Sequence, residues 1–239
     1  MGTVLLVRHG QASFGSDDYD CLSELGIEQS RLLGDWLSAC GRTIDRAVVG
    51  GMKRHRQTAE ACLSAMGLGA CPLEIDAGFE EYDADEVVIR HRPEFADRQV
   101  LARLLAEHDN PRRAFQSIFS AAIDRWVGGE WDADYREPWS TFRTRCVAAL
   151  RRLTDDPGPS RTVAVFTSGG PITAICQHLL GIPDRSIFEL NWSIVNSSMT
   201  ALRFSSRSSS EHPGRVTLSS FNVVAHLERM QNVRLITYR

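Results

Sequence analysis

The chain has 239 residues, of which 43% are hydrophobic, and a formal net charge of −3 at pH 7. A chain of this length can bury a full core as one large or two small domains. The small net charge and the absence of a long run of Lys and Arg exclude binding to nucleic acid or to an anionic membrane surface through bulk electrostatics. Any anion must therefore be bound by a local group of side chains.

The first residues, MGTVLLVRHG, form a short apolar run that Arg8 interrupts. The run has neither a basic leader nor a small-residue cleavage site, so we expect no signal peptide and no membrane span, and a cytoplasmic protein. The six cysteines are scattered without a C-x-x-C pair. This spacing predicts buried free thiols in a reducing compartment, and we expect neither a metal nor a cofactor.

Apolar runs rich in Val and Ile alternate along the chain with helical periodicity, which is typical of an α/β fold with a mostly parallel sheet. In chain order, the predicted strands are 2–7, 45–51, 72–76 and 161–166, followed by two late strands at 186–204 and 214–222. Helices are predicted between Ser23 and Gly41, after the 45–51 strand as far as Gly67, from Trp139 to Leu153, and from about Pro171 onward. The late strands could also offer an edge to a second copy of the chain, as a homodimer.

Between residues 83 and 136 the pattern changes to helices joined by polar turns that contain Gly and Trp. We interpret this segment as a helical insertion over one edge of the sheet, within a single domain that spans residues 1–239. Its candidate substrate-binding groups are Arg90, His91, Arg92, Arg112 and Arg113. The alternative for these five side chains is a solvated charged face.

Three motifs directly follow predicted strands: RHG at 8–10, GGMKRHRQTAE at 50–60 and TSGG at 167–170. In open α/β sheets, ligands bind at the carboxyl ends of the strands. Guanidinium groups bind phosphate oxygens in pairs, and free N–H groups at the start of a helix add further donors. The sequence therefore predicts a site for a phosphoryl group at this edge of the sheet.

Two residues of these motifs have several interpretations. His9 is either a buried structural histidine or a nucleophile, since a neutral imidazole can attack phosphorus and form a phosphohistidine. Ser168 is a nucleophile, a phosphate ligand or a helix cap. A serine hydrolase is the least favoured of these hypotheses, because TSGG lacks the Gly-x-Ser-x-Gly turn and no later histidine suggests itself as a partner.

Taken together, six segments resemble successive motifs of the histidine phosphatase superfamily, in its phosphoglycerate mutase-like branch. These segments are LLVRHGQAS, YDCLSELGIEQSRLLGDWL, GGMKRHRQTAEA, FEEYD, VAVFTSGGPI and IVNSSMTALRF. The resemblance implies a three-layer α/β/α sandwich. It also implies a nucleophilic His9, a phosphoryl group held by Arg8 and Arg54, and a general acid and base at Glu81. Arg56 and Glu80 are the neighbours most easily confused with Arg54 and Glu81.

The chain departs from the family pattern at two positions. Ser168 stands where the family has a second histidine, so a neutral hydroxyl beside the N–H groups of Gly169 and Gly170 must hold the phosphoryl oxygens. His178 lies too far along the following helix to substitute, whereas His91 remains a candidate. Gly15 stands where mutases carry Asn, and FEEYDADEVV lacks the basic and aromatic pattern of the sugar-phosphate mutases.

These features predict a phosphatase that hydrolyses a small phosphomonoester through a phosphohistidine at His9. A mutase must also keep water away from the phosphohistidine, which a phosphatase need not do. Two alternatives stay open: phosphoglycerate mutase-type transfer, and a catalytically weakened relative that binds a phosphorylated ligand or a partner protein because Ser168 replaces the histidine.

Overall fold

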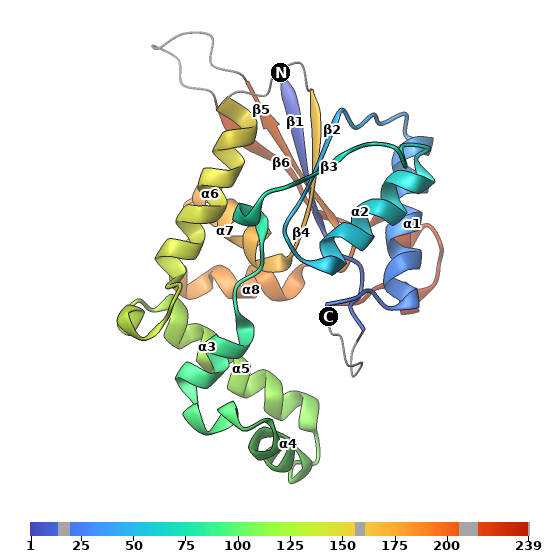
Figure 1. Ribbon diagram of the computed structural model, residues 1–239. Coiled ribbons are helices and arrows are strands. Elements are labelled where there is room, and N and C mark those ends of the chain that lie inside the picture. Colours follow the sequence, from blue (N-terminus) through green and yellow to red (C-terminus); the bar gives the residue numbers. More distant parts are fainter. Residues whose placement is uncertain (14–19, 156–160, 206–214, 239) are drawn as a thin grey trace.

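A computed structural model describes residues 1–13, 20–155, 161–205 and 215–238 of the chain, and Gly15 lies outside these ranges. Within them, six strands form one sheet in the order β3-β2-β4-β1-β5-β6 (Figure 1). The strands are β1 (Gly2–Arg8), β2 (Arg46–Val49), β3 (Leu73–Ile75), β4 (Thr162–Thr167), β5 (Met199–Phe204) and β6 (Val216–Val223). The first four are mutually parallel, β5 is antiparallel to β1 and β6 is antiparallel to β5, so the mostly parallel sheet is confirmed.

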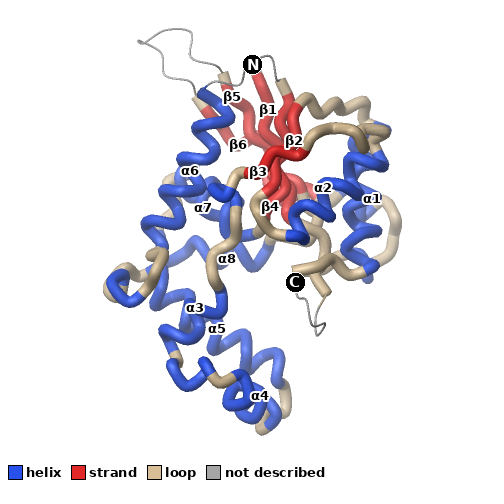
Figure 2. The backbone as a smooth tube through the Cα atoms, in the orientation of Figure 1, coloured by secondary structure: helices blue, strands red, loops and turns tan. Residues whose placement is uncertain are grey.

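Helices cover both faces of this sheet (Figure 2). One face carries α1 (Glu24–Ala39) and α2 (Lys53–Ala65), and the other carries α6 (Trp139–Asp155) and α7 (Gly169–Leu180). Side chains of β1 alternate between the two layers: Val4 and Leu6 pack toward α6 and α7, whereas Leu5 and Val7 pack toward α1 and α2. The three-layer α/β/α arrangement follows from this double-sided burial.

Two glycines bring the first helix close to the end of β1. The Ser23 side chain caps α1 by accepting a hydrogen bond from the Gly26 N–H at 3.1 Å. A Cβ atom on Gly10 would lie only 2.2 Å from the carbonyl oxygen of Gly26. Gly10 therefore allows α1 to approach the RHG turn closely.

Three helices lie between β3 and α6: α3 (Ala84–His91), α4 (Arg98–Ala106) and α5 (Pro111–Val127). They extend away from the sheet on the side of the carboxyl ends of its parallel strands (Figure 1). None of residues 98–106, all of which are described, is buried, whereas Ile123 and Trp126 of α5 are 1% exposed. The Trp126 ring packs edge-on against Trp139 of α6 at 5.2 Å between centroids, so the base of the helical segment is fixed to the core.

The prediction of a strand that begins at Ser186 is wrong for its first part. Residues 187–193 form helix α8 (Ile187–Ser193), and β5 begins only at Met199. Phe188 and Trp192 are four residues apart, so a helix places both on one face, where their ring centroids lie 6.0 Å apart with the ring planes tilted by 57°. The last helix is α9 (Ala225–Glu228). In the described part of the chain, no helix is both long and apolar enough to cross a membrane.

The cysteines of the described chain are all free thiols, but the prediction that they are buried holds for three of the six. Cys62, Cys146 and Cys176 are buried in the two helical layers, whereas Cys40 is exposed at the end of α1. Burial raises the pKa of the Cys62 thiol to about 12, so this group is protonated at neutral pH.

Candidate active site

The register of the sheet brings the RHG and TSGG motifs together. Arg8 pairs with Thr167 at the ends of β1 and β4, so His9 and Ser168 leave the sheet side by side. The His9 N–H donates to the Thr167 carbonyl at 2.8 Å, and α7 begins directly after Ser168, at Gly169. The parallel pairing of two central strands thus places a histidine beside the N-terminus of a twelve-residue helix.

The ring of His9 is buried and held in one tautomer. Its Nδ1 lies 2.7 Å from the Gly10 carbonyl, which can only accept, so Nδ1 carries the proton and Nε2 keeps its lone pair. Burial, and after it the positive charges of Arg54 and Arg8, hold the pKa of His9 well below its ordinary value. His9 is therefore neutral at neutral pH, as a nucleophilic imidazole must be.

Arg54 lies in the first turn of α2 with 7% of its surface exposed, whereas Arg56 is exposed. Its Nη1 donates to the Asp20 carboxylate at 2.9 Å. The other oxygen of Asp20 accepts from the Lys53 backbone N–H, also at 2.9 Å. A carboxylate of the chain itself thus neutralises the arginine at the start of α2.

Arg8 is held by two main-chain carbonyls from the C-terminal part of the chain. Its Nη1 donates to Ile194 and its Nη2 donates to Tyr238, the latter at 2.8 Å. Its Nε lies beside the TSGG turn, 4.0 Å from the position that a Cβ on Gly169 would take. The guanidinium is therefore fixed between the C-terminal region and the start of α7.

Glu81 lies across the start of α7 from this group. Its Oε2 accepts from the Gly170 N–H and its Oε1 from the Tyr82 N–H, each at 3.2 Å. A Cβ on Gly170 would lie 2.0 Å from Oε1, so only glycine leaves room for this carboxyl group. Burial raises the pKa of Glu81, against the opposing effects of the Gly170 N–H, Arg54 and Arg8.

The chain before Glu81 runs over the ends of β2 and β4. The Thr167 hydroxyl donates to the Phe79 carbonyl at 2.6 Å, and Phe79 itself is fully buried. The carboxylate of Glu80 points toward the turn after β2, where a Cβ on Gly51 would lie 2.0 Å from it. The two neighbouring glutamates therefore face different turns, and Glu81 is the one that contacts the TSGG turn.

Ser168 occupies the N-cap position of α7, but its hydroxyl makes no capping hydrogen bond within the described structure. Instead, its Oγ lies 2.7 Å from Nε2 of His55, and both side chains are fully buried. The sequence interpretation overlooked His55 as a partner of Ser168. The available signal was its spacing, because His55, Thr58, Ala59 and Cys62 recur at helical intervals and all are buried.

The two histidines that were considered as substitutes lie elsewhere. His178 is in the last turn of α7, at the end opposite the site. His91 ends α3, and the charged groups that act on it are Arg92, Arg125 and Glu94 of the helical segment. Within the described ranges, no group of three or more His, Cys, Asp or Glu side chains is placed to hold a metal ion.

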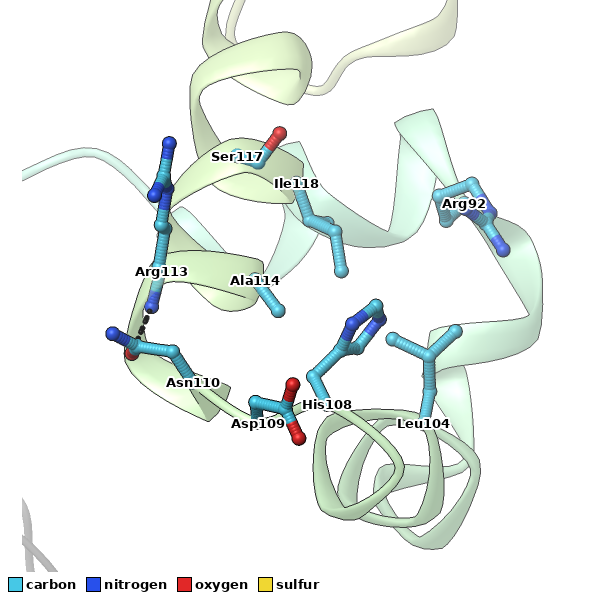
Figure 3. A pocket seen from close by; sticks show the side chains of 9 residues that line it. All are labelled: Arg92, Leu104, His108, Asp109, Asn110, Arg113, Ala114, Ser117 and Ile118. Atoms are coloured by element: carbon cyan, nitrogen blue, oxygen red, sulfur yellow. Dashed lines mark hydrogen bonds between the residues drawn. The ribbon is translucent and has the colours of Figure 1, made fainter.

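Two pockets lie near the helical segment. One, of about 460 Å³, lies between α4 and α5 (Figure 3), and Arg92 and Arg113 are the two sequence candidates that line it. The other, of about 320 Å³, lies next to Glu81. It is lined by Ala77, Glu80, Glu81, Tyr82, Asp83, Glu86, Val87, Trp126, Tyr135, Arg136, Glu137 and Arg145. The second pocket is therefore contiguous with the Glu81 carboxyl group.

Comparison with known proteins identifies the family. The family model of the histidine phosphatase superfamily (branch 1) matches residues 4–211. The chain belongs to this superfamily.

Solved structures with the same histidine phosphatase fold include phosphatases and a mutase. A phosphoglycerate mutase from Bacillus anthracis is 18% identical, with 97% of each chain covered and a TM-score of 0.64. A mycobacterial glucosyl-3-phosphoglycerate phosphatase is 19% identical over 93% of this chain and 99% of that one, with a TM-score of 0.62. A phosphoserine phosphatase from Entamoeba histolytica is 17% identical over 95% of this chain and 100% of that one, with a TM-score of 0.63.

Proposed function

We propose that this histidine phosphatase hydrolyses a phosphomonoester through a phosphohistidine at His9. The observation that carries the proposal is the neutral, buried His9, whose unprotonated Nε2 stands among Arg8, Arg54 and the start of α7. Nε2 attacks phosphorus while the bond from phosphorus to the ester oxygen breaks. Glu81 gives its proton to the departing alcohol, then takes a proton from the water that attacks the phosphohistidine. Inorganic phosphate and free His9 result.

The residues around His9 supply the positive charge and the donors that a phosphoryl group needs. Arg8 and Arg54 flank the ring closely enough to lower its pKa, and Gly169 and Ser168 lie at the start of α7. The raised pKa of Glu81 suits a general acid that must hold its proton before the leaving group departs.

The pocket beside Glu81 favours hydrolysis over phosphoglycerate mutation. Its acidic side chains outnumber its two arginines, and both arginines are already paired: Arg136 with Asp83 and Glu86, and Arg145 with Glu137. A mutase substrate brings a carboxylate and a second phosphate, and this wall would repel both. The alcohol part of the substrate, to which the phosphoryl group is attached, is therefore expected to be neutral or cationic.

The test is a screen of phosphomonoesters at acidic and neutral pH with the wild type and His9→Ala. His178→Ala, the same substitution at the far end of α7, is the matched control. We expect release of inorganic phosphate by the wild type and by His178→Ala, and a loss of about 10⁴-fold or more in His9→Ala, because the nucleophile is absent. Equal turnover by wild type and His9→Ala would contradict the proposal, and ligand binding without turnover would favour a weakened, ligand-binding relative.

A further inference from the structure

Two buried imidazoles lie next to each other at the carboxyl edge of the sheet. The ring centroids of His9 and His55 are 5.8 Å apart, with 35° between the ring planes. His9 follows β1, whereas His55 enters from the first turn of α2. The mechanism above uses only the first of these two rings.

The surroundings of His55 are shaped to accept its ring. A Cβ on Gly50, directly after β2, would lie 2.5 Å from Nδ1 of His55 and 2.6 Å from the Phe79 carbonyl oxygen. Glycine at this position therefore leaves room for an imidazole between the ends of β2 and β4. A polar ring that is completely buried costs free energy unless its nitrogens are used, so this ring is expected to have a task.

The hydrogen bond to Ser168 indicates what that task is. A hydroxyl has one proton, and Ser168 does not use its side chain to cap α7. If the hydroxyl donated to His55, its lone pairs would face the oxygens of a bound phosphoryl group and repel them. If His55 donates instead, the hydroxyl proton is directed outward, toward the phosphoryl group.

The contacts of the ring favour the second arrangement. Nδ1 of His55 lies beside the Gly50 backbone, which opposes the lowering of the pKa of the ring but forms no hydrogen bond of acceptable geometry with Nδ1 among the described residues, so a proton on Nδ1 would be poorly satisfied. A proton on Nε2 finds the Ser168 oxygen at 2.7 Å. Burial and the charge of Arg54 lower the pKa of His55 to about 3, so the ring carries a single proton to place.

We propose that His55 is a positioning residue that acts through Ser168: its Nε2–H donates to the Ser168 oxygen and thereby directs the Ser168 hydroxyl proton to a phosphoryl oxygen next to His9. The inference rests on the proposed function, because it requires a phosphoryl group at this place. A side chain of α2 thus completes a donor that Ser168 alone does not fix.

The test is a double-mutant cycle with two side chains of similar size at position 55. His55→Leu removes the donor and retains much of the volume, whereas His55→Gln places an amide N–H near the position of Nε2. Each substitution is made both in the protein with Ser168 and in the Ser168→Ala variant, and His178→Ala is the control. The measurements are the Kd of inorganic phosphate and of orthovanadate, kcat and KM for a phosphomonoester, and the unfolding temperature.

We expect His55→Leu to weaken vanadate binding and to lower kcat/KM about tenfold, which is the effect of one misdirected hydrogen bond. In the Ser168→Ala variant, the same substitution should change both quantities less than about twofold. His55→Gln should recover most of the loss. Nitrogen-15 shifts of the phosphate-bound protein should show the proton of His55 on Nε2.

Equal losses of binding and kcat/KM from His55→Leu in the Ser168 and Ser168→Ala backgrounds would show a merely structural role for His55. Three other results would also overturn the inference: no loss in His55→Leu, no binding of phosphate or vanadate to the wild type, or a proton on Nδ1 of His55. An inactive Ser168→Ala variant together with an active His9→Ala variant would identify Ser168 as the nucleophile and would also overturn the inference. If the mutant cycle shows the expected coupling between His55 and Ser168 in phosphate binding but His9 is never phosphorylated, this inference stands and the proposed function is refuted.

Discussion

Among the residues that the structure describes, two buried serine–histidine pairs of nearly the same geometry lie in different regions. Ser168 and His55 are 2.7 Å apart between Oγ and Nε2, and Ser197 and His226 are 2.8 Å apart between the same atoms. In both pairs burial lowers the pKa of the histidine, to about 3 for His55 and about 4 for His226. The bond alone therefore does not distinguish a site from a structural contact.

The surroundings of the pairs differ. The first pair stands at the ends of two parallel strands, beside His9, and the charge of Arg54 acts on its imidazole. The second is formed by α9 and the turn before β5, and its imidazole packs against Trp36 of α1 at 6.4 Å between ring centroids. The Ser197 N–H donates to the His9 carbonyl at 3.1 Å, but among the described residues burial is the one effect on the pKa of His226, whereas the charge of Arg54 also acts on His55. We therefore expect changes in the first region to alter turnover and changes at His226 to alter mainly stability.

The largest effect that separates the two regions is expected from Glu81→Gln. The amide retains the shape of the side chain but cannot give a proton to the leaving alcohol, so kcat should fall about 10²–10⁴-fold. Steady-state kinetics with an alkyl phosphomonoester measure this loss. Glu80→Gln is the matched control, and a larger loss in that variant would show that the acid has been misassigned.

The pH profile of kcat/KM sharpens the same assignment. The activity of the wild type should rise as His9 loses its proton, below the usual pH range of a histidine, and fall as Glu81 loses its proton, above the usual range of a glutamate. The optimum is therefore expected on the acidic side of neutrality. The alkaline limb should disappear in Glu81→Gln, and its persistence would assign that limb to another group.

An intermediate effect, on stability alone, is expected from His226→Leu. The lost bond leaves the buried Ser197 hydroxyl unsatisfied and should lower the free energy of unfolding by about 2 kcal/mol at pH 8, with turnover of the folded protein unchanged.

The same histidine makes stability depend on pH. The folded protein keeps His226 neutral down to about pH 4, whereas the unfolded chain takes up a proton below about pH 6.5. Stability is therefore lost as the pH falls, by about 2 kcal/mol at pH 5 for this group. Urea unfolding at pH 8 and pH 5 should show a smaller loss in His226→Leu, and an equal loss would contradict the assignment.

The smallest effect is expected from Asp20→Asn. This change removes the carboxylate that neutralises Arg54, so the positive potential of the first region increases and phosphate should bind about threefold more tightly. Asp35→Asn, which breaks an exposed pair with Arg31 on α1, is the control. Weaker phosphate binding in Asp20→Asn would show that Asp20 positions Arg54 rather than competing with the ligand.

Much of the architecture could be predicted because buried parallel strands are continuous runs of Val, Ile and Leu. The ends of these runs also located the RHG and TSGG turns, which the register of β1 and β4 brings together. The misassigned segment at residues 187–193 is rich in large apolar residues, which suit a strand as well as a buried helix.

The contact between His55 and Ser168 joins residues 113 positions apart, and no local pattern encodes it. The same holds for the carbonyls of Ile194 and Tyr238 that fix Arg8. Such contacts depend on how α2 and the C-terminal region pack on the sheet. Sequence motifs therefore identified the groups of the site, whereas their partners emerged only from tertiary structure.

The most direct test of the proposed mechanism is to trap the phosphorylated protein. The wild type is mixed with a phosphorus-32-labelled phosphomonoester, quenched within milliseconds under alkaline conditions, and analysed by peptide mass spectrometry. We predict acid-labile, alkali-stable phosphate on the peptide that contains His9, and none on His9→Ala. Phosphate bound at Ser168, or full turnover without a phosphorylated His9, would contradict the mechanism.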